Sequence, residues 1–176
     1  MGSVKMPWLL LVLTLSFFAG CGGMVDDLNP SNADKHHVGD IAPDFTLSDT
    51  LGTSVTLSSV LTGTAVDGVV LYFTMWCPVC EVHMNSIQSS QIPSFPNVRF
   101  YAVDYVSGTV ADARNAELSN GFAGTGFVVL ADTTRAVLGS YNATMGTTVV
   151  IDKTGVIQMK EDYKSDRLAA ALAALP

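Results

Sequence analysis

The pattern of hydrophobic and polar positions predicts four strands between residues 38 and 103. Val38–Leu61 alternates apolar and polar residues on both sides of a turn at Gly52, which is typical of a β-hairpin whose second strand is Ser54–Leu57. Val69–Phe73 and Val98–Val103 are short apolar runs rich in β-branched and aromatic residues, as expected of strands that are buried on both faces. The pattern therefore predicts a hairpin followed by two central strands.

The remaining periodic segments alternate between helical and strand spacing. The expected helices are Cys77–Gln91, closed by Pro93 and Pro96, then Val110–Asn120, Thr133–Leu138 and Ser165–Leu175. The expected further strands are Phe127–Leu130, Thr147–Ile151 and Val156–Met159. Strands that alternate with helices and end in a hairpin predict an α/β fold. We expect a central mixed β-sheet flanked by helices, with an N-terminal β-hairpin extension.

The first twenty residues have the pattern of a secretory signal. Pro7–Ala19 is too short to cross a hydrocarbon core of roughly 30 Å as a helix, but it has the length of a signal-peptide apolar region. It runs into Phe18-Ala19-Gly20-Cys21, which resembles the lipobox of bacterial lipoproteins. The resemblance implies a lipoprotein signal peptide over residues 1–20 and a lipid anchor on Cys21. An ordinary cleaved signal peptide is the alternative.

Residues 21–37 are polar and turn-rich, which predicts a flexible tether. His36 and His37 at its end lack the fixed geometry of metal ligands. Residues 38–176 then have the length of one domain. The chain carries 9 basic and 16 acidic residues, a formal net charge of −7. This balance argues against a nucleic-acid partner, which would require a basic face.

Two of the three cysteines, Cys77 and Cys80, are separated by Pro78 and Val79 at the predicted start of a helix. A C-x-x-C pair after a strand is typical of a redox-active disulfide, whereas zinc sites need further ligands. Pro78 is tolerated in the first helical turn. The N–H groups and the dipole at the helix start favour a thiolate. We therefore expect Cys77 to be the more exposed cysteine with the lower pKa, and Cys80 to be buried.

With Trp76 before this pair, Leu71–Cys80 resembles the active-site strand and helix of thioredoxin-like proteins. Val38–Leu47 looks like the entry segment of the alkyl hydroperoxide reductase and thiol-specific antioxidant superfamily, and Gly146–Gly155 looks like its late hairpin. The resemblance implies a thioredoxin-like fold over residues 38–176 and no cofactor. It leaves two activities open, because the superfamily contains both peroxiredoxins and anchored periplasmic thiol-disulfide reductases.

The peroxiredoxin motif fits the chain less well than the reductase motif. In that register Cys80 takes the place of the peroxidatic cysteine, but Phe73 stands at the family's proline and Cys77 at its threonine. The family's active-site arginine would fall just before the late hairpin, and residues 136–152 contain no lysine or arginine. A low-pKa thiolate needs such a neighbour or an equivalent dipole. We therefore favour a thiol-disulfide oxidoreductase, with a thiol peroxidase as the alternative.

The chain also departs from the reductase pattern at two places. The resemblance puts a proton-relaying acid where Leu71 stands, so the proton must come from water or another carboxylate, of which Glu81 is nearest in sequence. It puts a cis-proline opposite the cysteines where Gly146 stands, preceded by Met145. A cis bond without proline costs about 2.5–4 kcal/mol, so we expect a trans bond or a distorted loop. If the proline has simply been lost, Gly146→Pro should retain disulfide exchange.

A copper-binding or copper-delivery protein is a further alternative. Cys77, Cys80 and His83 could share one helix face, and copper-delivery proteins of this fold pair two cysteines with a histidine. Burial habits favour a partly exposed surface role for His83, so no metal ligand is assigned. The expected site is catalytic Cys77 and Cys80 surrounded by Trp76, Pro78, Val79, Met145 and Gly146.

These expectations describe an enzyme of the bacterial cell envelope. Cys77 would attack a substrate disulfide, and Cys80 would resolve the mixed disulfide. The implied partners are cysteine-containing envelope proteins and an upstream thiol reductant. The lipid anchor would hold the chain to a membrane facing the periplasm, and the residue after Cys21 is not the aspartate that signals retention at the inner membrane.

Overall fold

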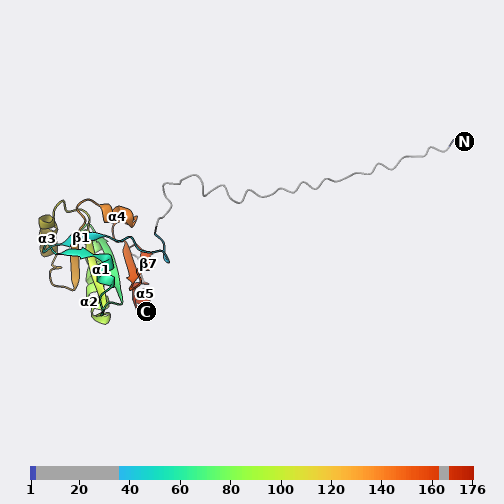
Figure 1. Ribbon diagram of the computed structural model, residues 1–176. Helices are drawn as coiled ribbons and strands as arrows, with labels where there is room; N and C mark the ends of the chain where they lie inside the picture. The colour runs from blue at the N-terminus through green and yellow to red at the C-terminus, as the bar shows by residue number, and fades with distance from the viewer. Residues whose placement is uncertain (3–35, 163–166) are drawn as a thin grey trace. The chain divides into compact units, whose positions relative to one another are not determined.

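The computed structural model describes residues 1–2, 36–162 and 167–176. From residue 36 onward the described chain builds a seven-stranded mixed sheet with helices around it (Figure 1). The expected α/β fold is therefore confirmed. The expected signal peptide, apart from its first two residues, and most of the expected tether lie outside the described residues. None of the helices in the described part of the chain is long and apolar enough to span a membrane.

The strands are short and the longest helix follows the first central strand. The strands are β1 (Thr46–Asp49), β2 (Ser54–Thr56), β3 (Gly68–Thr74), β4 (Val98–Asp104), β5 (Phe127–Ala131), β6 (Thr148–Asp152) and β7 (Ile157–Glu161). The helices are α1 (Leu57–Leu61), α2 (Pro78–Ser94), α3 (Val110–Ser119), α4 (Ala136–Ser140) and α5 (Leu168–Ala173).

The sheet has the order β2-β1-β5-β4-β3-β6-β7. β3, β4 and β5 run parallel at its centre, while β1 and β6 run antiparallel to the strands beside them. β1 and β2 form the expected N-terminal hairpin. The register pairs Thr74 at the end of β3 with Asp104 at the end of β4. The carboxyl ends of the parallel strands therefore meet at one edge, which is where open α/β sheets place their sites.

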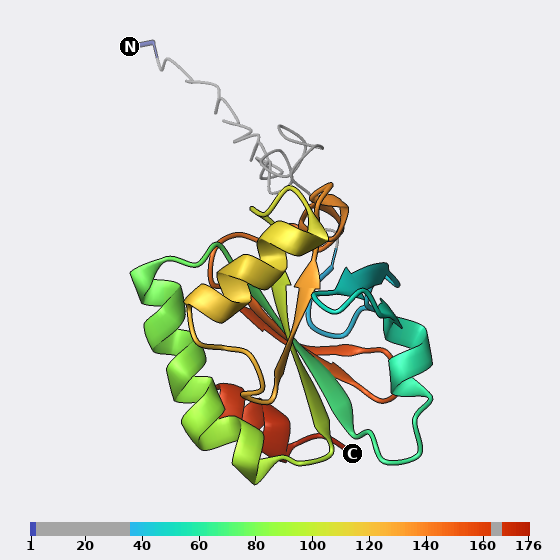
Figure 2. The same cartoon turned by 90° about the vertical axis from the view of Figure 1, so that its left-hand side faces the viewer.

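Alternating side chains of β3 enter two separate cores on the two faces of the sheet. Leu71 and Phe73 pack with residues of α1 and α4 on one face. Tyr72 packs with residues of α2 and α5 on the other face, and Cys80 belongs to that second core. Figure 2 shows α2 and α5 on one side of the sheet and α1 on the opposite side. The alternation along β3 therefore places Tyr72 on the face of the sheet that carries Cys80, and Leu71 and Phe73 on the other face.

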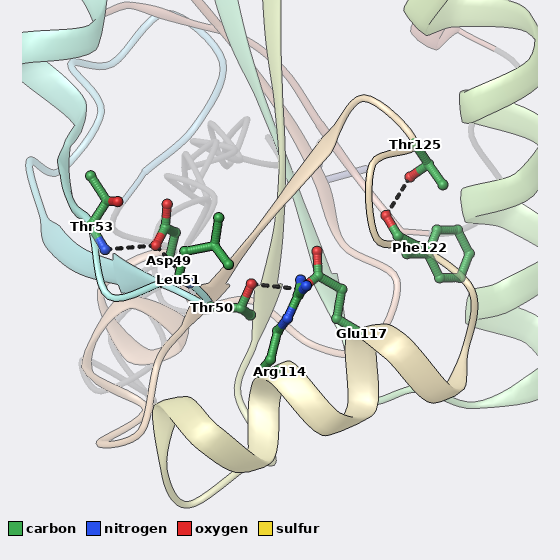
Figure 3. A network of polar contacts seen from close by, with 8 residues as sticks. All are labelled: Asp49, Thr50, Leu51, Thr53, Arg114, Glu117, Phe122 and Thr125. Carbon is green, nitrogen blue, oxygen red and sulfur yellow. Dashed lines mark hydrogen bonds and ion pairs between the residues drawn. The ribbon is translucent and has the colours of Figure 1, made fainter.

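A buried polar contact ties the hairpin to α3 (Figure 3). Glu117 of α3 is 4 % exposed and accepts a hydrogen bond from the Thr50 hydroxyl at 2.6 Å. The same Glu117 oxygen pairs with Arg114, one turn earlier on the helix, at 2.6 Å. Buried carboxylates are stable only when such partners satisfy them. This contact links two segments that are 67 residues apart in the sequence.

The helices depart from the expectation at several places: α1 was not predicted, α4 begins at Ala136 instead of Thr133 and ends at Ser140 instead of Leu138, and α2 has a later end. α2 does not end at Gln91 but continues through Pro93 to Ser94. A proline interrupts a helix because it lacks an N–H and its ring crowds the preceding turn. Here Pro93 lies in the last turn, and the N–H of Phe95 still bonds to the Gln91 carbonyl at 3.0 Å. The last turn of α2 therefore keeps its final backbone hydrogen bond although it contains Pro93.

Candidate active site

The segment between β3 and α2 carries both cysteines of the pair. β3 ends at Thr74 and α2 begins at Pro78, so Cys77 is the residue that caps the helix. Its Sγ accepts the backbone N–H of Cys80 at 3.1 Å. This contact satisfies one of the N–H groups that have no partner within the first turn of a helix. Pro78 occupies the first helical position, where the missing N–H of proline leaves no bond unmade.

The two thiols are in contact but differ in access. Both cysteines are free, and their Sγ atoms lie 2.6 Å apart. Cys80 is only 1 % exposed, whereas Cys77 is partly exposed and the side chain of Val79 beside it is open to solvent. A protein substrate can therefore reach Cys77 and not Cys80. The expected order of exposure agrees with the structure.

The order of the two pKa values is opposite to the expectation. Burial, and then the hydrogen bond with Cys80, raise the pKa of the Cys77 thiol. Burial by itself would also raise the pKa of the Cys80 thiol. Hydrogen bonds from the Cys77 side chain and from backbone N–H groups instead hold that pKa below its ordinary value, and the Thr74 hydroxyl contributes to them. The prediction that Cys77 has the lower pKa is wrong, because these bonds to Cys80 outweigh the helix end.

Trp76 is held in a strained conformation by two hydrogen bonds. Its φ of 58° lies in the left-handed region, which costs a non-glycine residue about 1–3 kcal/mol. Its backbone N–H donates to the Thr74 hydroxyl at 3.1 Å, and its indole Nε1 donates to a carboxylate oxygen of Asp104 at 2.8 Å. Asp104 is fully buried at the end of β4. These contacts stabilise the turn that places Cys77 at the helix start.

Met145 and Gly146 face the pair from the loop before β6. The Met145 sulfur lies 3.3 Å from Cys77 Sγ, in contact with the thiol. The Gly146 N–H donates to the carbonyl of Phe73 at 2.8 Å, and Gly146 has φ 77°. No peptide bond among the described residues is cis, in agreement with the trans bond expected here. The loop therefore continues the hydrogen bonding of the sheet.

This geometry changes the interpretation of Gly146. Proline fixes φ near −65° and has no N–H, so it fits neither the φ of Gly146 nor the hydrogen bond to Phe73. The loop is not a family proline site that has merely lost its proline. We therefore expect Gly146→Pro to disrupt the loop, contrary to the expectation from the sequence.

The family of the chain follows from its similarity to known proteins. The model of the AhpC/TSA family matches residues 38–160. The chain belongs to the AhpC/TSA family. A search of curated protein sequences gave no match.

Solved structures similar to this AhpC/TSA chain have a thioredoxin-like fold. A proposed protein disulfide isomerase from Bacteroides thetaiotaomicron is 23% identical with a TM-score of 0.65, over 78% of this chain and 87% of that one. A proposed thiol:disulfide interchange protein DsbE from Chlorobium tepidum is 25% identical, with a TM-score of 0.62, over 80% of this chain and 99% of that one. Peroxidoxin BcpB from Mycobacterium tuberculosis is 24% identical, with a TM-score of 0.59, over 80% of this chain and 96% of that one. The expected thioredoxin-like fold is confirmed, and it is the fold of both thiol-disulfide oxidoreductase-like and peroxiredoxin-like proteins among these structures.

Two polar residues near the pair were not found from the sequence of this AhpC/TSA protein. From the sequence, Leu71 stands at the position of the proton-relaying acid and Glu81 is the nearest carboxylate; the Leu71 side chain packs on the sheet face opposite to Cys80. Tyr72 is the residue of β3 that shares the core of Cys80, and its buried hydroxyl has no hydrogen-bond partner. The side-chain alternation of a strand was the available signal for Tyr72. For Asp104, the signal was an acid directly at the end of a buried apolar strand.

The other candidates from the sequence lie around the first turns of α2. Glu81 is exposed in the first turn. The ring of His83 packs edge-on against Tyr72 with 5.2 Å between centroids, and burial lowers the pKa of His83. Within residues 36–162 and 167–176, no three His, Cys, Asp or Glu side chains gather as they would around a metal ion.

Proposed function

We propose that this protein is a thiol-disulfide oxidoreductase that acts on cysteine-containing proteins through Cys77 and Cys80. The observation that carries the proposal is the contact between one accessible sulfur and one buried sulfur, 2.6 Å apart. An accessible thiol can form a mixed disulfide with a protein substrate. A second thiol in contact with it can then resolve that disulfide without leaving the fold.

The first step uses Cys80 as the proton acceptor for Cys77. In the reduced pair with one proton, the hydrogen bonds around Cys80 favour its thiolate, and Cys77 carries the proton. As Cys77 Sγ attacks a sulfur of the substrate disulfide, its proton passes to Cys80. The substrate S–S bond breaks, a Cys77–substrate disulfide forms, and the other substrate sulfur leaves as a thiolate.

The second step releases the substrate. Cys80 loses its proton to solvent or to the departing sulfur and attacks Cys77 Sγ. The mixed disulfide breaks, the Cys77–Cys80 disulfide forms, and the second substrate sulfur leaves. Two electrons have then passed from the pair to the substrate, and an upstream thiol reductant must return them. The same steps in reverse would oxidise a substrate dithiol, so the reduction potential decides the direction.

A thiol peroxidase is the second candidate. It is supported by the family, by the likeness to peroxidoxin BcpB and by the lowered pKa of Cys80, the residue in the peroxidatic register. Against it, Cys80 is 1 % exposed. The described arginines bond to other groups: Arg99 to the Pro96 carbonyl, Arg114 to Glu117, Arg135 to the Tyr105 carbonyl and Arg167 to Glu161. Disulfide exchange is therefore the better supported activity.

The proposal extends to the location of the protein. The signal-like segment over residues 1–20 and Cys21 in its lipobox context support a lipid anchor that holds the chain to the envelope, facing the periplasm. Cysteine-containing envelope proteins would then be the substrates. The net charge of −7 gives no support to a nucleic-acid partner.

A direct comparison of two reactions tests the proposal. The purified protein is given a dithiol donor together with either a disulfide-bonded protein such as insulin or hydrogen peroxide. We expect rapid reduction of the protein disulfide, loss of this activity in Cys77→Ser, and slow consumption of peroxide. Rapid oxidation by peroxide with weak disulfide reduction would select the peroxidase instead.

A further inference from the structure

Tyr72 places an unsatisfied hydroxyl in the core that contains Cys80. The residue lies in β3, is fully buried, and packs with Cys80 and Met84 of α2. Its hydroxyl oxygen has no hydrogen-bond partner. A buried hydroxyl without a partner is unfavourable, and most are paired in folded proteins. A Tyr72 hydroxyl kept at this position therefore requires an explanation.

The surroundings of Tyr72 point to Cys80 as the missing acceptor. The ring of His83, three residues after Cys80 on α2, packs edge-on against the Tyr72 ring at 5.2 Å. This contact and the strand hold the Tyr72 ring against α2, in the core that contains Cys80. Burial, and then negative charge on Cys80 and Cys77, raise the pKa of Tyr72 far above its ordinary value. Tyr72 therefore keeps its proton and can act only as a donor toward a thiolate.

We propose that Tyr72 donates a hydrogen bond to the Cys80 thiolate and thereby favours the reduced form of the pair. The inference rests on the proposed function, because it assigns a role in the redox equilibrium of Cys77 and Cys80. Hydrogen bonds to an ionised acceptor are stronger than neutral ones. In the oxidised pair Cys80 has no charge and its sulfur is a weak acceptor. The Tyr72 hydroxyl then has no ionised acceptor.

The redox step gives the direction of the effect. When the reduced pair with one proton is oxidised, Cys77 and the Cys80 thiolate lose two electrons and the Cys77 proton and form one S–S bond, while a disulfide such as oxidised glutathione gains the two electrons and this proton and becomes one thiol and one thiolate. The Cys80 thiolate disappears in this step. Removing its hydrogen-bond donor destabilises only the reduced side. The pair without the Tyr72 hydroxyl should therefore oxidise more readily.

The variant Tyr72→Phe tests this with little change in shape. We expect its equilibrium constant with a glutathione redox buffer to shift about tenfold toward the disulfide, which is a reduction potential about 30 mV more negative. The pKa of the Cys80 thiolate, followed by ultraviolet absorbance against pH, should rise. The other titratable groups near Cys80 are Cys77 and Tyr105, and His83 lies against the Tyr72 ring. Each is retained in the variant.

Tyr141→Phe is the matched control. Tyr141 is also fully buried, but it packs on the opposite face of the sheet and its hydroxyl donates to the Pro43 carbonyl at 2.8 Å. Its loss should lower stability and leave the potential unchanged. An unchanged potential and thiolate pKa in Tyr72→Phe would overturn the inference. If the wild-type pair forms no disulfide in oxidised glutathione, the proposed function itself fails, which is a separate outcome.

Discussion

The indole N–H of Trp76 donates a 2.8 Å hydrogen bond to the buried carboxylate of Asp104, which lies 28 residues further along the chain. The same carboxylate accepts the backbone N–H groups of Val106 and Ser107 and the Ser107 hydroxyl. Asp104 therefore joins the turn that holds Cys77 to the loop that follows β4. The position of the accessible thiol depends on this neighbouring strand as well as on its own helix.

Access decides which cysteine attacks, even though Cys80 has the lower pKa. Cys80→Ser should accumulate a mixed disulfide with substrate through Cys77, because the resolving sulfur is gone. Its formation should be slower than attack by the wild-type protein, because Cys80 is no longer there to take the proton. Cys77→Ser should trap little, since its remaining thiol is 1 % exposed. Mass spectrometry of adducts from both variants measures this. Adducts through Cys80 alone would assign the nucleophile to the peroxiredoxin register.

Gly146→Pro should destabilise the protein by about 3 kcal/mol or more, because proline removes a backbone donor and cannot adopt a positive φ. Gly146→Ala keeps the N–H and provides the comparison. We expect it to cost about 1–2 kcal/mol from the left-handed conformation alone. Urea unfolding of both variants gives the two free energies. A Gly146→Pro protein as stable as Gly146→Ala would mean that the bond to Phe73 contributes nothing.

Cys21→Ser should move the protein from the membrane fraction to the soluble fraction of cells, because the serine cannot carry the lipid. The lipid expected on Cys21 would be the main source of membrane affinity. Cys77→Ser is the control and should stay with the membranes. Immunoblots of both fractions report the result, and a Cys21→Ser protein that remains membrane-bound contradicts the lipoprotein assignment.

Glu117→Ala should lower the free energy of unfolding by about 1–3 kcal/mol, because the buried Thr50 hydroxyl loses its acceptor. Arg114 is partly exposed and can turn to water, which limits the loss. Glu81→Ala on the exposed face of α2 is the matched control and should change stability by about 0.5 kcal/mol or less. Denaturant titration distinguishes the two. Equal stability of the two variants would show that the link between the hairpin and α3 is dispensable.

Local patterns predicted the fold and the cysteine pair because their signals lie within short segments. The apolar run of β3, the following C-x-x-C and the hairpin of β1 and β2 can all be recognised over about ten residues each. The continuation of α2 past Pro93 could not, because it depends on whether the last turn can still close.

The remaining features depend on contacts between distant segments. The bond between Trp76 and Asp104 requires the register of β3 against β4, which no local pattern specifies. The order of the thiol pKa values depends on how many donors converge on Cys80, and this follows only from the fold of the turn after β3. A sequence shows where a thiol stands relative to a helix end, but not which hydrogen bonds reach its sulfur.

Because Cys77 is partly exposed and Cys80 is buried, molecules in solution can react with Cys77, whereas Cys80 reacts only with Cys77. Toward a small disulfide such as oxidised glutathione, the molecule presents a single reactive thiol, because Cys80 in the first turn of α2 is buried. Oxidised glutathione can form a mixed disulfide with Cys77, releasing one glutathione thiolate, but it does not reach Cys80. Cys80, whose sulfur lies 2.6 Å from that of Cys77, can then resolve such an adduct from within the protein.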